Sequence, residues 1–115
     1  INQVIMNLVV NAIDAIEGIG EITVSTGVIK EEVYVSIEDT GMGIPEADLK
    51  QIFVQGFTTK PIGKGSGLGL ALSKDIMDKH QGRIEVISEV GKGSKFTIWI
   101  PIKSSDDEND FGKIK

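Results

Sequence analysis

The feature that most constrains the fold is a pair of neighbouring segments that alternate polar and apolar residues. Residues 21–28 (EITVSTGV) and 32–38 (EVYVSIE) both alternate, and the charged turn Lys30-Glu31-Glu32 separates them. A period of two places the apolar side chains of a strand on one face of a sheet. The two segments therefore predict an antiparallel hairpin with one buried face, which a second layer must cover.

Two segments with helical spacing can supply that layer. In residues 2–17, apolar side chains recur at three- and four-residue steps until Gly18 ends the pattern. Residues 67–80 return to the same spacing, and Gly82 is predicted to be a left-handed stop after His80. Both segments are expected to be amphipathic helices.

A second predicted hairpin completes the order of elements. Residues 83–88 (RIEVIS) and 95–102 (KFTIWIPI) are predicted strands, and Pro45 stands at a plausible first position of a short helix, EADLKQIF. A long loop is expected at 54–66. This order predicts an α+β fold, a two-layer α/β sandwich with a mixed sheet covered on one face by about three helices. The acidic residues 103–115 are predicted to be a disordered tail.

Composition limits the classes of function. The 115 residues suffice for one domain, and the net charge of −5 argues against binding nucleic acid or anionic membranes through the whole surface. The absence of cysteine excludes disulfides, thiolate catalysis and Cys-based zinc sites. The sequence contains no run of 18 apolar residues, so no membrane-spanning helix is predicted. The motif GxxxxGK(S/T) and the glycine spacing of dinucleotide-binding domains are both absent.

Three polar features are candidate sites. Asn7 and Asn11 share one face of the first predicted helix, where their amides either satisfy structural hydrogen bonds or offer oxygen to Mg²⁺. Asp39 ends a strand before a glycine turn. It either starts an ordinary turn or accepts a hydrogen bond from the exocyclic amine of a bound ring. The glycines would let such a flat ring approach the backbone, because they carry no Cβ. The run GKGSGLGLAL (63–72) leads into a helix and is either a hinge or an anion site, with Lys60 and Lys64 nearby.

Taken in order, five segments resemble the ATP-binding catalytic domain of two-component sensor histidine kinases, in the superfamily of DNA gyrase, Hsp90 and MutL. They are NLVVNAIDA, DTGMGIP, IFVQGFTTK, GKGSGLGLAL and VGKGSKFTIWIP. The resemblance covers residues 1–102 and implies the Bergerat ATP-binding fold. The strand that usually precedes the first helix in this family is missing from the sequence, which begins at Ile1 in mid-pattern, so an excised domain is expected.

The resemblance implies a site for ATP and Mg²⁺. Asn11 would ligate Mg²⁺, Asn7 would help to bind the phosphate–Mg²⁺ unit, Asp14 would add a nucleotide contact, and Asp39 would take the adenine amino group. Lys60 would lie near the phosphates and act with Asn7 and Asn11 in catalysis. The further nucleotide-binding residues implied by the resemblance are Gly41, Gly43, Ile44, Phe57, Thr58, Thr59, Lys60, Gly65, Ser66, Gly67, Leu68, Gly69, Leu70 and Thr97.

Several of these residues have narrower implied roles. Gly65, Gly67 and Gly69 would lie under the phosphates, and Thr97 would reach the adenine edge through water. Phe53 and Phe57 match a phenylalanine segment of the family and are expected mainly to pack in the core.

The implied reaction transfers the γ-phosphoryl group of ATP to a histidine on a separate dimerisation domain, with the receiver domain of a response regulator downstream. His80, the only histidine of the chain, is not expected to be the acceptor, because it stands at a helix end and matches a non-acceptor histidine of the family. Asn7 replaces the glutamate with which gyrase-like ATPases activate water, so fast hydrolysis is disfavoured.

The resemblance further implies a cytoplasmic domain, monomeric when isolated and part of a homodimeric kinase, with no nucleic-acid partner. Two other readings stay open. One is a protein-serine kinase of the anti-sigma type, and the other is a non-catalytic module that senses ATP.

Overall fold

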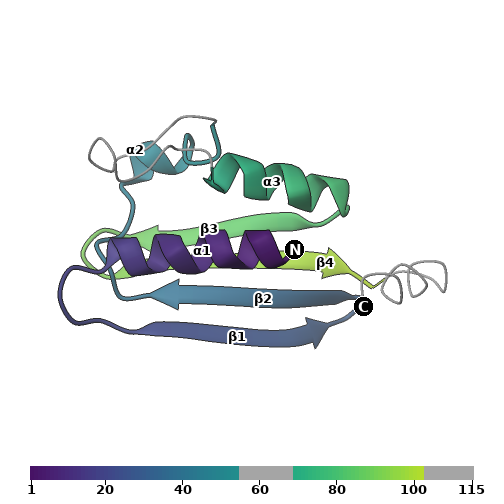
Figure 1. Cartoon of the computed structure of the whole chain (residues 1–115), viewed down its shortest axis with the longest axis horizontal. Helices are drawn as coiled ribbons and strands as arrows, with labels where there is room; N and C mark the ends of the chain where they lie inside the picture. The colour runs from purple at the N-terminus through teal and green to yellow at the C-terminus, as the bar shows by residue number, and fades with distance from the viewer. Residues whose placement is uncertain (55–68, 103–115) are drawn as a thin grey trace.

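The computed structural model describes residues 1–54 and 69–102, which form two layers (Figure 1). The helices are α1 (Asn2–Ala15), the short α2 (Glu46–Leu49) and α3 (Gly69–Lys79). The strands are β1 (Ile22–Ile29), β2 (Glu32–Asp39), β3 (Arg83–Glu89) and β4 (Gly93–Pro101). The predicted two-layer α+β sandwich is confirmed. The tail 103–115 and nearly all of the loop predicted at 54–66 lie outside the described residues.

The four strands form one sheet in the order β1-β2-β4-β3, and each neighbouring pair is antiparallel. Among the described strands the sheet is therefore antiparallel rather than mixed. Both consecutive pairs are joined by tight turns, which only antiparallel neighbours allow, and β4 then runs opposite to β2. In this register Asp39 pairs with Ile22 of β1 on one side and with Ser94 of β4 on the other.

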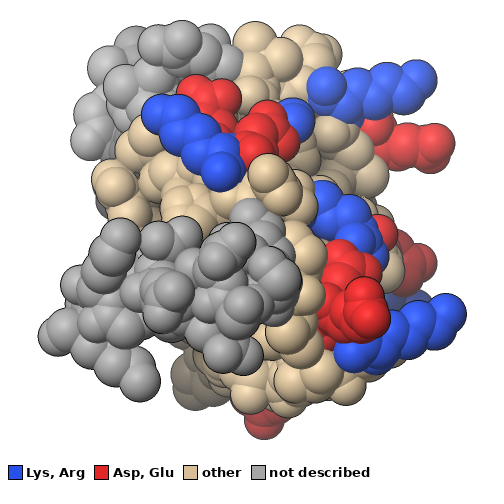
Figure 2. All heavy atoms as spheres, turned by 90° about the vertical axis from the view of Figure 1, so that its right-hand side faces the viewer, with Lys and Arg blue, Asp and Glu red and all other residues tan. Residues whose placement is uncertain are grey.

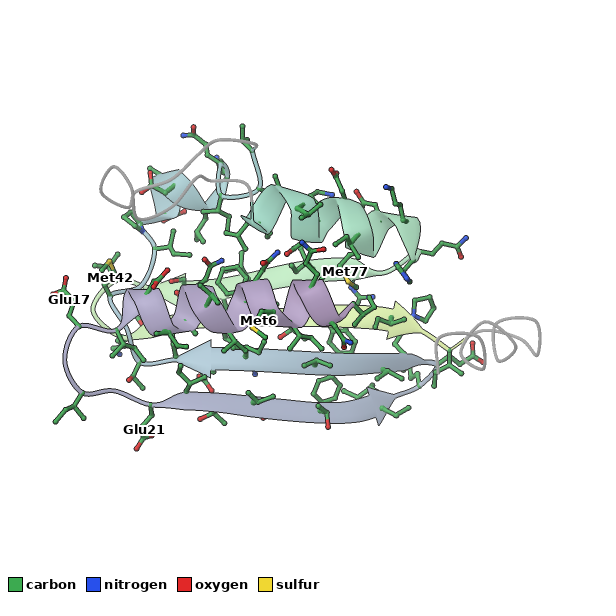
Figure 3. The ribbon with its side chains drawn as sticks, in the orientation of Figure 1. Met6, Glu17, Glu21, Met42 and Met77 are labelled. Atoms are coloured by element: carbon green, nitrogen blue, oxygen red, sulfur yellow. The ribbon has the colours of Figure 1, made fainter. Side chains whose placement is uncertain are left out.

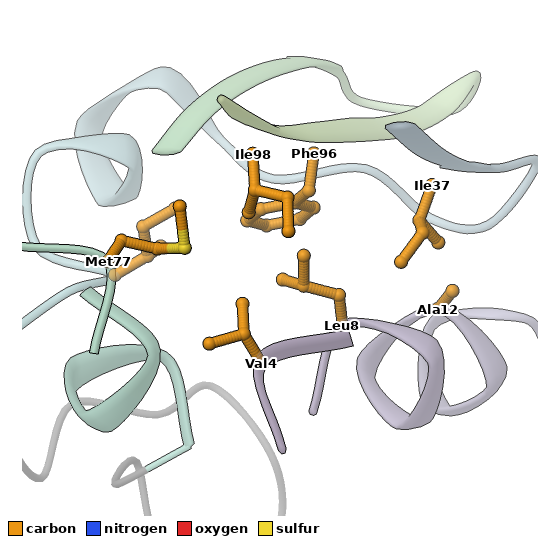
Figure 4. Packing of buried hydrophobic residues seen from close by; sticks show 8 residues of the cluster. Val4, Leu8, Ala12, Ile37, Met77, Phe96 and Ile98 are labelled. Carbon is orange, nitrogen blue, oxygen red and sulfur yellow. The ribbon is translucent and has the colours of Figure 1, made fainter. Parts of the chain in front are cut away.

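The core lies between the sheet and the two longer helices (Figure 4). Val4, Leu8 and Ala12 recur every four residues on α1, and all three are buried against the sheet. Met77 of α3 has no exposed surface, and its side chain packs into the core from α3. Each large side chain buried in this way contributes about 1.5–3 kcal/mol to folding. The remaining described members of the buried cluster are Ile37, Ile52, Phe96 and Ile98.

Two helix boundaries differ from the prediction. Gly82 is not the left-handed residue after α3; Gln81 takes that conformation, with φ of 60°. Glycine is instead needed at 82 because a Cβ there would lie 2.3 Å from the carbonyl oxygen of Trp99. The second helix comprises only Glu46–Leu49, with Pro45 as its N-cap in an extended conformation.

Charged side chains of both signs are interspersed on the surface. Figure 2 shows this on the end of the molecule that lies to the right in Figure 1, where Lys and Arg lie beside Asp and Glu. Among the described residues, Lys74 and Asp78 of α3 form an ion pair at 3.2 Å, and Arg83 of β3 pairs with Glu32 of β2. The described residues on that face therefore do not form the continuous basic stripe that binding to a phosphate backbone uses.

Candidate functional site

The candidate site is centred on Asp39, the last residue of β2. Although it is a carboxylate, Asp39 is only 4% exposed, which is rare for an aspartate unless the group is hydrogen-bonded or functional. The backbone N–H of Gly41 donates to its Oδ1 at 2.8 Å. The turn thus binds one carboxylate oxygen at the end of the sheet where α1 also ends.

The glycine turn after Asp39 is held from two sides. The N–H of Met42 donates to the carbonyl of Ala15 at 3.0 Å, and the N–H of Gly91 donates to the carbonyl of Met42 at 2.9 Å. Figure 3 shows Met42 at the same end of the molecule as Glu17, just beyond α1. A Cβ at Gly41 would lie 2.4 Å from the Ala15 carbonyl oxygen, and one at Gly43 (φ +78°) would lie 2.2 Å from a carbonyl oxygen of β3. Close packing against its own chain therefore already requires both glycines.

A row of polar side chains continues from Asp39 across the sheet. Asp39 pairs with Ser94 of β4, and Ser94 pairs with Ser88 of β3. Residues paired across antiparallel strands share a face, so all three side chains lie on the side that the helices cover. The Oγ atoms of Ser88 and Ser94 are 2.8 Å apart. The sequence-based site did not include either serine.

Thr97 lies on the other face of the sheet. Its neighbours along β4, Phe96 and Ile98, are buried under the helices, so the side chain of Thr97 points away from them. Its Oγ1 is 3.3 Å from the Oγ of Ser36. Thr97, expected to reach the adenine edge, thus lies on the face opposite to Asp39, whereas Ser94 lies beside Asp39. The period of two along β4 was the available signal, because residue 94 shares the face of residues 96 and 98.

Asn7 connects α1 to the first turn of α3. Its Nδ2 donates to the carbonyl of Gly69 and to the Oγ of Ser73, both at 3.2 Å. Ser73 is fully buried, and its Oγ donates to the same carbonyl at 2.8 Å. The structural role left open for the asparagine pair is thus confirmed for the Nδ2 of Asn7. Asn11 and Asp14 follow along α1, and each has interaction partners in the structure.

The structure brings together one end of β2, the asparagine face of α1 and the beginning of α3. The helix predicted over residues 67–80 is observed as α3, Gly69–Lys79. Ile44, Phe53 and Leu70 pack against the core, as expected for Phe53. The predicted residues Phe57, Thr58, Thr59, Lys60, Gly65, Ser66, Gly67 and Leu68 lie outside the described residues.

His80 directly follows α3. Its backbone N–H donates to the carbonyl of Ile76 at 3.2 Å, and its Nδ1 lies 2.9 Å from the same oxygen. The imidazole thus contacts the end of its own helix, at the position the sequence predicted.

The family model for histidine kinase-, DNA gyrase B- and HSP90-like ATPases matches residues 1–104. The chain belongs to this family. It is 44% identical over 102 residues to the sensor histidine kinase ZraS of Escherichia coli strain K12, a match that covers 89% of this chain and 22% of ZraS. The chain therefore spans about a fifth of the length of that relative.

Solved histidine kinase structures share the fold. The nucleotide-free catalytic domain of histidine kinase ThkA matches with 38% identity and a TM-score of 0.75, over 86% of this chain and 64% of that one. Full-length ShkA, solved in complex with AMPPNP, matches with 29% identity and a TM-score of 0.77, over 86% of this chain and 20% of ShkA. The resemblance to histidine kinase catalytic domains is confirmed. Within residues 1–54 and 69–102, no helix is long and apolar enough to cross a membrane.

Proposed function

We propose that this domain binds Mg²⁺–ATP and transfers the γ-phosphoryl group to a histidine on a separate dimerisation domain. The buried carboxylate of Asp39 at the glycine turn is the observation that carries the proposal. Since Gly41 occupies Oδ1, Oδ2 is the oxygen that would accept a hydrogen bond from the amino group of adenine. Guanine carries a carbonyl oxygen at that position, so two hydrogen-bond acceptors would face each other.

Ser94 would complete the base site in place of Thr97. It is 6% exposed and paired directly with Asp39 across β2 and β4. Its hydroxyl therefore lies beside the carboxylate on the helix-facing side, where it can contact the base edge or a water bound to it. Gly41, Gly43 and Ile44 would border the ring.

Magnesium fits the donors that α1 provides. Within the described residues, no group of three or more His, Cys, Asp and Glu side chains could hold a metal. Mg²⁺ does not need such a cage, because in nucleotide sites it takes one or two protein oxygens and completes its shell with phosphates and water. The amide oxygen of Asn11 would be that protein ligand. A bound Mg²⁺ would neutralise charge on the phosphates.

Asn7 would position the phosphate–Mg²⁺ unit rather than activate water. Its Nδ2 donates to Gly69 and Ser73, and these two bonds orient the amide, so its Oδ1 is the atom proposed to face the phosphate–Mg²⁺ unit. An amide does not take up a proton at neutral pH, so Asn7 supplies no general base. ATP would thus be protected from hydrolysis until an imidazole, already a nucleophile when neutral, is brought to the γ-phosphorus.

The remaining phosphate contacts are proposed for Lys60, for Thr58 and Thr59, and for the glycines that precede α3. Asp14 would add a weaker contact from α1. Phosphoryl transfer requires mainly positioning and charge neutralisation, and these groups would supply both. The acceptor histidine would lie on the dimerisation domain of a homodimeric kinase, and a response regulator would take the phosphoryl group onward. Because the reaction consumes ATP, we place the domain in the cytoplasm.

The magnesium assignment is tested by ATP titrations at several Mg²⁺ concentrations with Asn11→Ala. The variant is expected to lose the gain in affinity that Mg²⁺ gives the wild type while keeping its affinity in EDTA. Asn2→Ala, an exposed asparagine on the same helix, is the matched control and should behave as wild type. An unchanged Mg²⁺ dependence in Asn11→Ala would refute the ligand assignment.

A further inference from the structure

The hydroxyl of Ser88 is the centre of a small hydrogen-bond network under the proposed base site. It accepts from the backbone N–H of Ile44 at 2.7 Å and donates to the carbonyl of Gly93 at 3.1 Å. It also lies 2.8 Å from the hydroxyl of Ser94. The backbone partners have fixed roles, because an N–H only donates and a carbonyl only accepts.

Counting protons gives the direction of the third bond. Ser88 has one hydroxyl proton, and the carbonyl of Gly93 takes it. Either hydroxyl could donate the bond between the two serines, and with the Ser88 proton on Gly93 we assign Ser94 as its donor. Ser88 thereby accepts two hydrogen bonds and donates one, which is the full capacity of a hydroxyl. The opposite arrangement would take the hydroxyl proton away from Gly93, a buried residue.

We propose that Ser88 is a specificity-determining positioning residue, which holds the proton of Ser94 toward β3 so that Ser94 offers the nucleotide base only its lone pairs. This inference rests on the proposed adenine site. Asp39 lies directly across from Ser94 and is itself an acceptor when ionised. Asp39 and Ser94 then form one surface of the base site, called here the acceptor-only floor, which offers the base hydrogen-bond acceptors and no donor.

An acceptor-only floor selects a base that carries an amino group. The 6-amino group of adenine has two N–H donors, whereas hypoxanthine and guanine carry an oxygen at that position. A serine is ordinarily adaptable, because it can rotate its proton toward a ligand oxygen. Here that rotation would break the bond to Ser88, so Ser88 raises the penalty for a 6-oxo base without touching the nucleotide.

The ratio of the dissociation constants of ITP and ATP measures this effect. Calorimetric titrations with the wild type, Ser88→Ala and Ser88→Thr would be compared. In Ser88→Ala the proton of Ser94 is released and can turn to the 6-oxygen, so the ITP/ATP ratio should fall by about two- to tenfold, the worth of one neutral hydrogen bond. Ser88→Thr keeps the hydroxyl on a strand that tolerates β-branching and should keep the wild-type ratio.

A merely structural role for Ser88 predicts a different result. Loss of the bond from Ile44 would weaken ATP and ITP binding by the same factor and leave the ratio unchanged, which would overturn the proposal. Ser94→Ala provides a second check, because adding Ser88→Ala to it should not alter the ratio further. If Ser88→Ala does not fold, Ser88→Cys replaces it, since a thiol is a poor hydrogen-bonding group.

The two levels of the proposal fail in different ways. Wild-type protein that binds ATP but keeps its ITP/ATP ratio in both Ser88→Ala and Ser88→Cys would contradict only the role of Ser88. Wild-type protein that binds neither nucleotide would overturn the proposed function, together with the base site on which Ser88 acts.

Discussion

Asp39→Asn should weaken ATP binding without unfolding the domain. Asparagine has the size of aspartate and keeps one carbonyl oxygen, so it can still accept the 2.8 Å bond from the N–H of Gly41. The second carboxylate oxygen becomes an NH₂ group, which would face the amino group of adenine with two donors opposed. A hydrogen bond to a charged group contributes about 1.5–3 kcal/mol, so the dissociation constant of ATP should rise by about 10- to 150-fold.

The same change should narrow the preference for ATP over GTP, because the new NH₂ group can donate to the 6-oxygen of guanine. Isothermal titration with both nucleotides measures this, and thermal denaturation confirms that the variant is folded. Glu38→Gln is the matched control: it removes the neighbouring charge on the same strand from an exposed side chain on the opposite face and should leave both affinities unchanged. A folded Asp39→Asn protein with wild-type affinity for ATP would refute the role of the carboxylate.

Two further predictions concern stability and are checked by urea denaturation. Met77→Ala should lower the free energy of unfolding by about 2–5 kcal/mol because Met77 is fully buried. Met6→Ala is the control: its side chain is 61% exposed, so the free energy of unfolding should change by at most about 0.5 kcal/mol. Equal losses in the two variants would contradict the packing of α3 against the core. Gly93→Ala should cost about 2–5 kcal/mol, since its Cβ would lie 1.9 Å from the Asp39 carbonyl oxygen at φ +129°. Gly91→Ala is the control: with φ +84° and open space around the Cβ, it should lower the free energy of unfolding by only about 1–2 kcal/mol. A similar loss of stability in both variants would refute the close approach of β4 to Asp39.

The elements could be predicted from the sequence because their signals are local. The helical spacing that ends at Gly18 gave α1, observed as Asn2–Ala15, and the alternation on either side of Lys30 gave the first hairpin. Burial of one face imposes these periods along a short stretch of chain, so no knowledge of distant contacts is needed. Asp39 was likewise visible as a carboxylate between a strand and a glycine turn.

The parts that could not be predicted depend on contacts between distant segments. Ser94 enters the site through the register of β2 against β4, and a period along one strand does not reveal which residue of another strand lies opposite. Thr97, the residue predicted from the sequence, lies on the opposite face of β4 from Ser94. Gly82 is another case, because its requirement comes from the approach of Trp99 in β4. The bond from Asn7 to Ser73 joins residues 66 positions apart.

The central claim is that this domain phosphorylates a histidine outside itself. The direct measurement mixes the domain with a separately prepared, histidine-bearing dimerisation domain of the same kinase and ATP labelled at the γ-phosphate. We predict acid-labile label on the dimerisation domain, lost when its acceptor histidine is replaced by alanine and strongly reduced with Asp39→Asn. This domain alone should stay unlabelled. No transfer to the dimerisation domain by a domain that binds Mg²⁺–ATP, or stable label on this chain itself that survives His80→Ala, would contradict the account.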